Sequence, residues 1–348
     1  MALDLSPKPS KKITEADGGF YAAWSGADQP ALIDSKVGAG ILGLKPLGFA
    51  LPHRADSPKS GYVLEGRGLV GLVLPGDTKE RVLLLKKGDV ITLPPGNLSW
   101  WYNDGDTDFS VVFLGDTSRA VHPGDMAYFF LAGGVGIFTG FSMEVLKKAW
   151  GVGEEEARKL LKSQPGLLII KLKERLHGIK PSETDAEGIV LNTEHARLGT
   201  NIEKGGHAVA VRSADLAVLE EVSFSINFTK LEPNAIRMPG FFLEGSAQLI
   251  YIIKGSAHVE ISGTDGKGVL DTEVKEGCLF LVPKFFAAAM IAGGEGMEWF
   301  SIITDKKPIF RQLTGAASLL STLSPQILGA AFNVTPDHVK LLTPKESI

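Results

Sequence analysis

Four residues of this chain could together line a small-molecule site: His53, Lys59, Ser99 and Trp101. Ser99 and Trp101 lie two positions apart, and side chains two apart in a strand point to the same face. If that face points into a barrel with His53 and Lys59, a few polar groups meet an aromatic wall, which is the usual composition of a ligand pocket. His53 could then do metal-independent acid–base work, such as an isomerisation or cyclisation.

A filled barrel is the competing interpretation of the same residues. Small barrels are normally packed with side chains, and Trp101 is large enough to occupy such an interior. We favour the filled barrel, so we expect no catalytic residues and no enzyme. Ligand binding by the four residues is expected only if the barrel is open.

The rest of the sequence contains no competing catalytic motif. There is no Gly-x-Ser-x-Gly sequence and no Walker A loop. The single cysteine, Cys278, lies in an apolar run, so we expect a buried residue and no intrachain disulfide. The remaining histidines have no His-x-His or i, i+4 spacing and are expected to be surface or hydrogen-bonded residues: His122, His177, His195, His207, His258 and His338.

An internal repeat supplies the elements that would position these residues. Tyr62–Gly66 and Tyr251–Gly255 share a pattern, and each is followed by Gly and then Pro at the same intervals, with an offset of 189 residues throughout. The following residues are Gly88 and Pro94 in the first copy and Gly277 and Pro283 in the second. A duplicated unit indicates two domains of one architecture.

Short β-rich runs fill both copies. They include 61–64, 69–74, 82–85, 90–93 and 109–114 in the first, and 222–228, 249–253, 258–261, 278–282 and 299–303 in the second. Gly, Pro, Asp and Asn separate these runs, which is typical of an all-β sandwich or barrel rather than of βαβ units.

Each copy ends in a helical pattern. Residues 141–152 match 323–334, and each segment has a serine at an N-cap position, Ser142 and Ser324. Second helices are expected from Glu154 and from Pro336. Apolar residues gather on one face of the first helices: Val145, Leu146, Ala149 and Trp150, with counterparts Ile327, Leu328, Ala331 and Phe332. That face could pack on its own barrel or contact another subunit.

The polar, Pro- and Gly-bearing stretch 178–188 has no counterpart inside a copy, so it is the expected interdomain connection. We therefore expect an N-terminal domain over residues 1–177 and a C-terminal domain over residues 178–348. Each would be a barrel with its own helical arm.

Composition excludes several classes of protein. The chain has 348 residues, 44% of them hydrophobic, and a net charge of −4, so nothing suggests a nucleic-acid partner or an anionic membrane surface. The longest apolar stretch, 129–141, is rich in glycine and too short to span a bilayer. Residues 1–17 lack the apolar core of a signal peptide, so we expect a cytoplasmic protein.

These motifs, taken in order along nearly the whole chain, resemble the cupin superfamily, which includes germin-like proteins and the 11S seed storage globulins of legumin type. The resemblance rests on five segments: Leu51-Pro52-His53, Leu93-Pro94-Pro95-Gly96, Val282-Pro283-Lys284, Gly140 to Val152, and Leu313 to Phe332. It implies two tandem jelly-roll β-barrels, each followed by a short helical extension. It also implies a nutrient-reservoir role and a homotrimer assembled through the helical arms.

The chain departs from the storage globulins, which are secretory, disulfide-linked and cleaved at an Asn-Gly bond. It has one cysteine and no Asn-Gly; the matching region reads Leu191-Asn192-Thr193-Glu194-His195. The resemblance is therefore to cytosolic, unprocessed plant bicupins. Besides copies of itself, the only partner we expect is a small apolar ligand. The alternative function is that of a small-ligand carrier or a metal-independent isomerase or cyclase.

The resemblance also implies where a metal would bind. Catalytic cupins use His-x-His, a Glu and a third His, and the matching positions here are His53, Ala55, roughly Lys59, and Ser99. In the second copy, Gly240, Gln248 and Ala288 occupy the region. One histidine cannot supply such a ligand set, so we expect no metal and no other cofactor.

Overall fold

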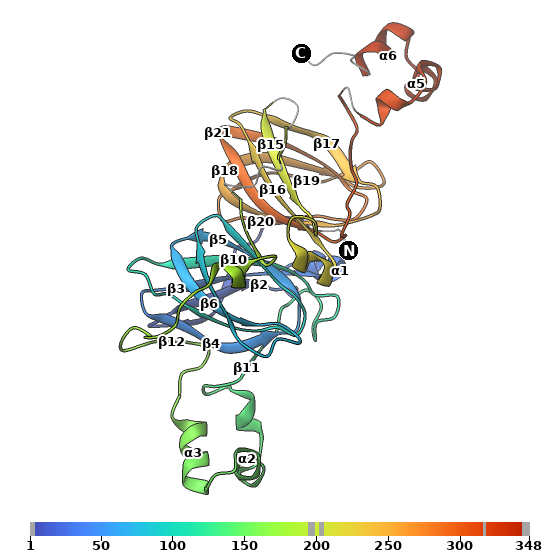
Figure 1. The fold of residues 1–348 in the computed structure, drawn as a ribbon. Coiled ribbons are helices and arrows are strands. Elements are labelled where there is room, and N and C mark those ends of the chain that lie inside the picture. The colour runs from blue at the N-terminus through green and yellow to red at the C-terminus, as the bar shows by residue number, and fades with distance from the viewer. Residues whose placement is uncertain (1–3, 194–198, 202–204, 316–317, 343–348) are drawn as a thin grey trace.

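A computed structural model describes residues 4–193, the backbone of 199–201, and residues 205–315 and 318–342. Two antiparallel β-barrels lie against each other, and a pair of helices projects from each far end (Figure 1). The predicted all-β class, two jelly-roll barrels each followed by a helical extension, is confirmed. His195 and Glu194 lie outside the described residues.

The first barrel is built from two facing sheets. Its strands are β1 (Lys11–Ala16), β2 (Gly19–Trp24), β3 (Val37–Leu44), β4 (Gly48–Ala55), β5 (Lys59–Glu65), β6 (Arg67–Val73), β7 (Arg81–Lys86), β8 (Asp89–Leu93), β9 (Leu98–Tyr102), β10 (Phe109–Asp116), β11 (Tyr128–Phe130), β12 (Ile169–Lys171) and β13 (Val190–Asn192). One sheet has the order β1-β2-β3-β10-β5-β8-β13, and the other has the order β11-β4-β9-β6-β7 with β12 beside β4.

The second barrel repeats this plan with longer strands. They are β14 (Gly199–Asn201), β15 (Gly206–Val211), β16 (Ser225–Leu231), β17 (Ile236–Phe242), β18 (Gln248–Ser262), β19 (Gly268–Lys275), β20 (Leu279–Val282), β21 (Ala287–Ile303) and β22 (Phe310–Gln312). The order is β14-β15-β16-β21-β17-β22, and β18 pairs with β19, β20 and β21. At the offset of 189, β18 corresponds to β5 and β6 joined without a break.

A glycine marks the same bend in both copies. Gly66 has φ +71° and Gly255 has φ +76°, a conformation that side chains disfavour. A Cβ atom on either residue would lie 2.0 Å from a backbone carbonyl oxygen, that of Asp108 or of Gly296. The repeated glycine therefore allows the neighbouring strands to approach closely.

The predicted helical pairs are present. The helices are α1 (Pro30–Ser35), α2 (Met143–Trp150), α3 (Glu154–Lys162), α4 (Glu183–Ala186), α5 (Pro325–Phe332) and α6 (Pro336–Leu342), with 3-10 turns η1 (Ile137–Gly140), η2 (Ala217–Glu221) and η3 (Leu320–Thr322). Ser142 and Ser324 cap α2 and α5 by accepting the backbone N–H of Val145 and Ile327. Among the described residues, no helix combines the length and apolarity needed to cross a membrane.

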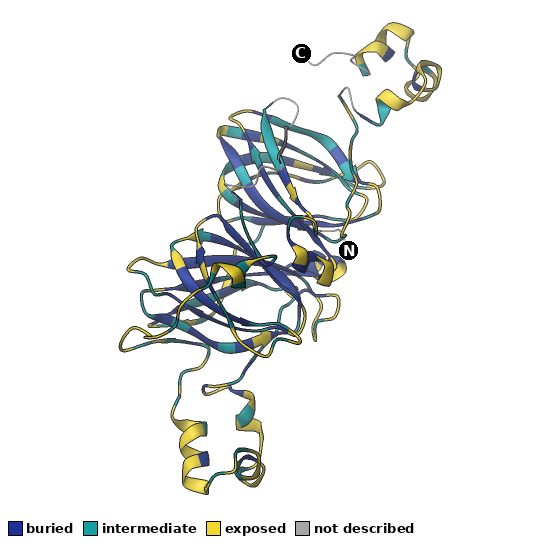
Figure 2. Cartoon of the chain, in the orientation of Figure 1, coloured by how far each residue is buried: buried dark blue, intermediate teal, exposed yellow. Residues whose placement is uncertain are grey.

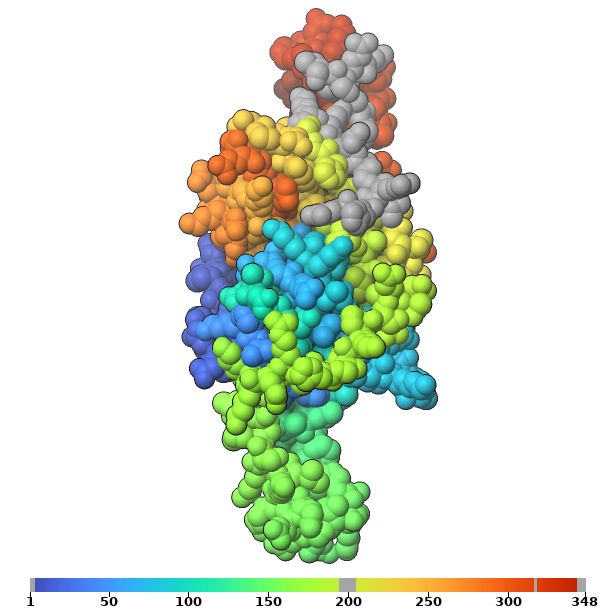
Figure 3. Space-filling model, turned by 60° about the vertical axis from the view of Figure 1, so that its left-hand side comes forward, coloured from blue at the N-terminus to red at the C-terminus, as the bar shows by residue number. Residues whose placement is uncertain are grey.

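The first helix of each arm buries only one of the four residues of its apolar face. Leu146 and Leu328 are 1% exposed, whereas Val145 is 50% exposed and Ile327 is 56% exposed. Both helical pairs are largely exposed, in contrast to the barrel strands (Figure 2). Helices α2 and α3 pack on each other, as do α5 and α6. The two arms lie at opposite ends of an elongated molecule (Figure 3), so their exposed faces are free of both barrels.

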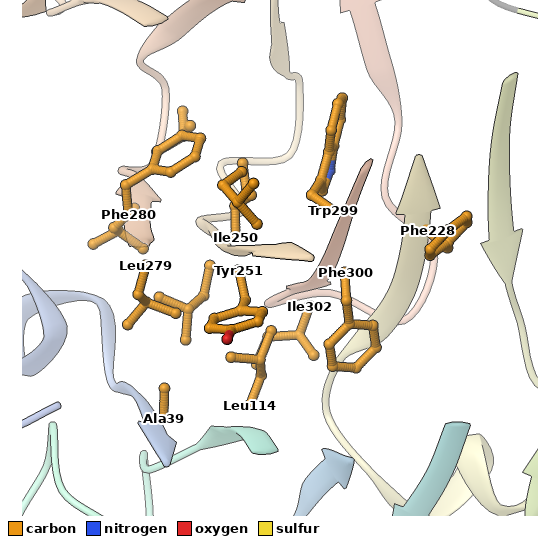
Figure 4. Packing of buried hydrophobic residues seen from close by; sticks show 14 of the residues in the cluster. Ala39, Leu114, Phe228, Ile250, Tyr251, Leu279, Phe280, Trp299, Phe300 and Ile302 are labelled. Atoms are coloured by element: carbon orange, nitrogen blue, oxygen red, sulfur yellow. The ribbon is translucent and has the colours of Figure 1, made fainter. Parts of the chain in front are cut away.

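One hydrophobic cluster spans both barrels, beside a separate core inside the first barrel. Tyr62 of β5 stacks on Phe228 and Phe300 of the second barrel, with ring centroids 6.0 and 5.6 Å apart. Its repeat equivalent, Tyr251, packs edge-on against Trp24 of the first barrel at 5.9 Å. Figure 4 shows Tyr251 among side chains from both halves. The interface is therefore apolar and roughly symmetric.

Segments preceding each copy are exchanged between the barrels. Lys8 forms a β-bridge with Leu279 of β20, and its carbonyl oxygen accepts the indole N–H of Trp24 at 2.7 Å. Strand β13, which precedes the second copy, pairs with β8 of the first barrel. The domain boundary at residue 178 stays a prediction, although the connection beyond it returns to the first barrel.

Candidate ligand site in the first barrel

A cavity of about 370 Å³ lies inside the first barrel. The expectation of a filled barrel is therefore wrong: Trp101 is buried but leaves this space beside it. The wall is mainly apolar, from residues that include Leu42, Ala50, Trp101, Phe113, Leu168 and Ile169. Ile13 borders the cavity and is 61% exposed, so the space reaches the surface beside β1.

Lys59, at the start of β5, brings a primary amine into this apolar space. The residue is 2% exposed, and its Nζ donates to the Tyr128 hydroxyl at 3.2 Å. Nζ also lies 4.2 Å from the Tyr128 ring centroid and 4.6 Å from that of Phe113. Burial lowers the pKa of Lys59 to about 7, and the charge of Asp56 only partly opposes that shift.

His53 of β4 faces the same cavity as a neutral ring. Its Nδ1 lies 2.8 Å from the carbonyl oxygen of Leu51, which can only accept, so Nδ1 carries the proton and Nε2 keeps its lone pair. The ring packs against Tyr128 and Phe130 at 5.4 and 5.0 Å. Burial, with a smaller effect of Lys59, lowers the pKa of His53 to about 3.

Two tyrosines complete the polar side. Tyr21 of β2 and Tyr128 of β11 share a hydrogen bond between their hydroxyls at 2.8 Å. Burial raises the pKa of both phenols well above its usual value, so both stay protonated at neutral pH. The hydroxyl of Tyr128 thus connects Lys59 to Tyr21 in one short chain.

The structure brings three of the four expected residues to the cavity. His53, Lys59 and Trp101 line it, and Ser99 is not among the lining residues. Ser99 lies opposite His53 in the β4–β9 pairing, and its hydroxyl accepts the indole N–H of Trp101 at 3.2 Å. The indole N–H of Trp101 therefore occupies one of the two acceptor lone pairs of the Ser99 hydroxyl. Ligand binding by these residues stays a prediction.

Sequence reasoning missed Tyr21 and Tyr128. Tyr21 lies in a strand that precedes the recognised repeat motifs. Tyr128 begins β11, which borders the glycine-rich apolar stretch and is only three residues long. Alternation in β2 offered a weak signal, because Tyr21 and Ala23 share a face and both line the cavity.

The donor set does not fit a cupin metal. Among the described residues that line the cavity, His53 carries the only imidazole, and its cross-strand neighbour is Ser99. The buried amine of Lys59 lies roughly where the resemblance to catalytic cupins places the carboxylate. In the described part of the chain, no group of three His, Cys, Asp or Glu side chains could hold an ion. A lysine amine is a poor metal ligand, so these side chains do not form a metal-binding set.

The second barrel has a different polar interior. Gln248, the repeat equivalent of Lys59, donates to the Ser301 hydroxyl at 2.9 Å and accepts from Arg237 at 3.4 Å. The guanidinium of Arg237 lies over the rings of Trp299 and Phe310. The polar interior of this barrel thus combines the amide of Gln248 with the guanidinium of Arg237.

Comparison with known proteins agrees with this architecture. The family model described as Cupin matches residues 5–158 and again residues 191–340. The chain belongs to the cupin family and contains two cupin barrels.

Its relatives place it more narrowly. It is 24% identical to the 11S globulin seed storage protein 2 of Sesamum indicum, over 96% of this chain and 87% of that one, and 26% identical to cocosin 1 of Cocos nucifera, over 85% and 76%. The crystal structure of the coconut allergen cocosin superposes with a TM-score of 0.88 at 26% identity, covering 99% of this chain and 97% of that one.

A solved 11S globulin from Wrightia tinctoria, whose title reports an auxin binding site, has a TM-score of 0.89 at 22% identity, covering 100% and 95%. The chain is thus a bicupin of the 11S globulin, or legumin, type.

Proposed function

We propose that this bicupin is a metal-free, non-enzymatic protein with a storage-type, nutrient-reservoir role. The observation that carries the proposal is the alignment of almost the whole chain, through both barrels and both arms, with 11S seed storage globulins. The site chemistry supports it, because His53 is a poor base. An imidazole whose pKa lies at about 3 takes up a proton inefficiently at neutral pH.

Protein abundance tests this role. Quantitative mass spectrometry of developing and germinating seeds should find the chain accumulating during maturation and disappearing during germination. A constant, low level in seeds and leaves alike would contradict a reservoir role.

We also propose self-association of the chain as a ring of three through the helical arms, and a cytoplasmic location. The exposed apolar faces at both ends of the molecule support the ring, because two similar faces related head to tail can close one. The single cysteine supports the location, since the chain cannot form the intrachain disulfide of secretory storage globulins. Imaging of a fluorescent fusion tests the location, and a vacuolar signal would contradict it.

The cavity favours a second candidate function, a carrier of a small apolar ligand in the first barrel. Its volume of about 370 Å³ falls within the range of ligand pockets, and its polar groups are few and concentrated on one side. The Wrightia tinctoria 11S globulin, whose title names an auxin site, offers a precedent in a protein of this fold.

Native mass spectrometry of protein purified from its own tissue tests the carrier. We expect a co-purifying small molecule that is lost in the Trp101→Ala variant. A panel of small aromatic and terpenoid compounds, followed by tryptophan fluorescence, gives the affinity. Absence of binding by every compound, together with ligand-free native protein, would contradict the carrier and leave the storage role untouched.

A further inference from the structure

The amine of Lys59 has a setting that neither storage nor simple carriage requires. It lies against two aromatic rings and one hydroxyl, in a cavity that reaches the surface. In the part of the chain that the structure describes, no carboxylate forms an ion pair with it; Asp56 acts on it only through its charge. We propose that the first barrel binds a small apolar aldehyde, which condenses with Lys59 Nζ to form an imine. This rests on the carrier proposed above and names its ligand class.

The apolar wall favours a neutral carbonyl compound over a carboxylate. A carboxylate would lose its hydration against Trp101, Phe113 and Ile169, whereas an aldehyde enters such a space at little cost. The charges of Asp56 and Asp125 also oppose an anion, and Lys59 compensates one only in its ammonium form. The cavity is large enough for one substituted aromatic ring or a short terpenoid chain.

The protonation state of Lys59 suits the reaction. Because burial lowers its pKa to about 7, a large fraction of the side chain is the free amine at neutral pH, and only the free amine is nucleophilic. The charged and titratable groups around it are few. His53 on β4 is neutral, Tyr21 on β2 and Tyr128 on β11 are protonated, and Asp56 and Asp125 supply the nearby negative charge.

The reaction balances without an oxidant or reductant. The Nζ lone pair forms a bond to the carbonyl carbon while the carbon–oxygen π bond breaks. One amine proton moves to that oxygen; the Tyr128 hydroxyl, 3.2 Å from Nζ, is placed to accept this proton while it passes its own proton to the oxygen. The nitrogen lone pair then forms the second carbon–nitrogen bond as the carbinol carbon–oxygen bond breaks. The oxygen leaves with its own proton and the second amine proton, so the products are one imine and one water.

Benzaldehyde with sodium cyanoborohydride tests the proposal, because hydride reduction converts the imine into a stable benzylamine. At pH 7 we expect one benzyl group per chain, mapped to Lys59 by peptide mass spectrometry. It should appear about tenfold faster, or more, than on exposed lysines, whose free-amine fraction is far smaller. The Lys59 labelling rate should rise with pH around 7 and level off, whereas exposed lysines keep accelerating to about pH 10.

Two variants of Lys59 test whether the reaction needs a nucleophilic amine or only a positive charge at this position. Lys59→Met and Lys59→Arg should both lose the fast adduct, while Lys148→Met, which removes an exposed lysine on α2, should keep it. The mapping on the unmodified chain decides the question even if both Lys59 variants fold poorly. Labelling spread over surface lysines with Lys59 unmodified would overturn the imine.

Two ligands without an aldehyde distinguish this inference from the carrier on which it rests. Benzyl alcohol has nearly the size of benzaldehyde and benzoate carries a charge, and neither can form an imine. Binding of either one by tryptophan fluorescence, without any adduct at Lys59 from benzaldehyde, overturns the imine and keeps the carrier. If none of the three compounds binds or reacts, the imine is overturned, and the carrier is decided by the compound panel and native mass spectrometry described above.

Discussion

At the level of single residues, burial controls the chemistry of the first barrel. In water His53 would be cationic at moderately acidic pH and Lys59 at neutral pH, yet in the barrel His53 stays neutral in moderate acid and Lys59 is only partly protonated at pH 7. Two buried bases thus face one apolar space without two full charges. That arrangement is suited to neutral ligands and differs from the histidine and glutamate ligands of a cupin metal centre.

The titration of His53 should make the protein acid-sensitive. Its pKa is about 3 in the folded chain and near 6.5 in the unfolded chain, so between these values only the unfolded chain binds the proton. The free energy of unfolding should fall as pH drops from 6.5 towards 3, by up to ~1.4 kcal/mol per pH unit from this residue. Lys59 is protonated in both states over most of this window and changes little.

Chemical denaturation at several pH values measures this slope. His53→Gln should flatten it, and His122→Gln, at an exposed histidine, should leave it unchanged. Equal slopes in the wild type and His53→Gln would contradict the assigned pKa.

Removal of the Trp101 side chain should be costly even though a cavity adjoins it. The indole packs against Phe113 at 5.2 Å and Phe109 at 6.5 Å and is 1% exposed. Trp101→Ala should lower the free energy of unfolding by ~3–5 kcal/mol, and Trp101→Phe should lower it less. Thermal unfolding of the three proteins measures this, and a near-native melting temperature for Trp101→Ala would contradict the packing.

Local strand alternation predicted part of this site, whereas the residues that meet only through long-range contacts were missed. Strand alternation placed Ser99 and Trp101 on the same face. It could not show that the Ser99 hydroxyl would accept a hydrogen bond from the indole N–H of Trp101. Tyr21 and Tyr128 lie 107 positions apart and meet only because β2 and β11 border the same cavity. Long-range contacts of this kind depend on the closed barrel, which no local pattern encodes.

At the level of elements, the helical arms were predictable almost to the residue. Their caps are local signals: Ser142 and Ser324 begin α2 and α5, and Gly151 and Asn333 end them in left-handed conformations. The fusion of β5 and β6 into a single β18 was not predictable, because both copies carry the same bend glycine, Gly66 or Gly255.

The exposed side of each arm should hold the assembly together. Ile327→Asp places a charge on a residue that is 56% exposed, so it should release monomers without unfolding the arm. Gln326→Asp, at the adjacent exposed position of α5, is the matched control and should remain assembled. Trp150→Asp should also release monomers, but Trp150 packs against Phe138 at 5.4 Å, which makes it a less clean test.

Analytical ultracentrifugation at micromolar concentration measures the outcome. A monomeric wild-type chain would contradict assembly through the arms.

At the level of the whole molecule, the shared core should make the barrels unfold together. Tyr62→Ala removes the ring that stacks on Phe228 and Phe300, at a cost of about 3 kcal/mol. We expect calorimetry to show one transition for the wild type and two for Tyr62→Ala. Tyr102→Ala, a buried tyrosine in another cluster of the first barrel, should keep one transition at a lower temperature. Two transitions in the wild type would contradict a common core.

The whole chain should also be free of tightly bound metal. Because each barrel has at most one of the four cupin ligands, elemental analysis of purified, untagged protein should find no stoichiometric Mn, Fe, Zn or Cu. About one tightly held transition metal per chain would refute this.

The bridge between Lys8 and Leu279 has a consequence for synthesis on the ribosome. Lys8 leaves the ribosome well before its partner strand β20, which emerges only after the first barrel and much of the second. At ordinary rates of translation this delay is on the order of tens of seconds. During that interval Leu5, which ends up 4% exposed beside Leu279, has no apolar surface of the second barrel to cover it. The nascent chain therefore exposes an apolar segment before the first barrel, to which chaperones can bind until the second barrel is complete.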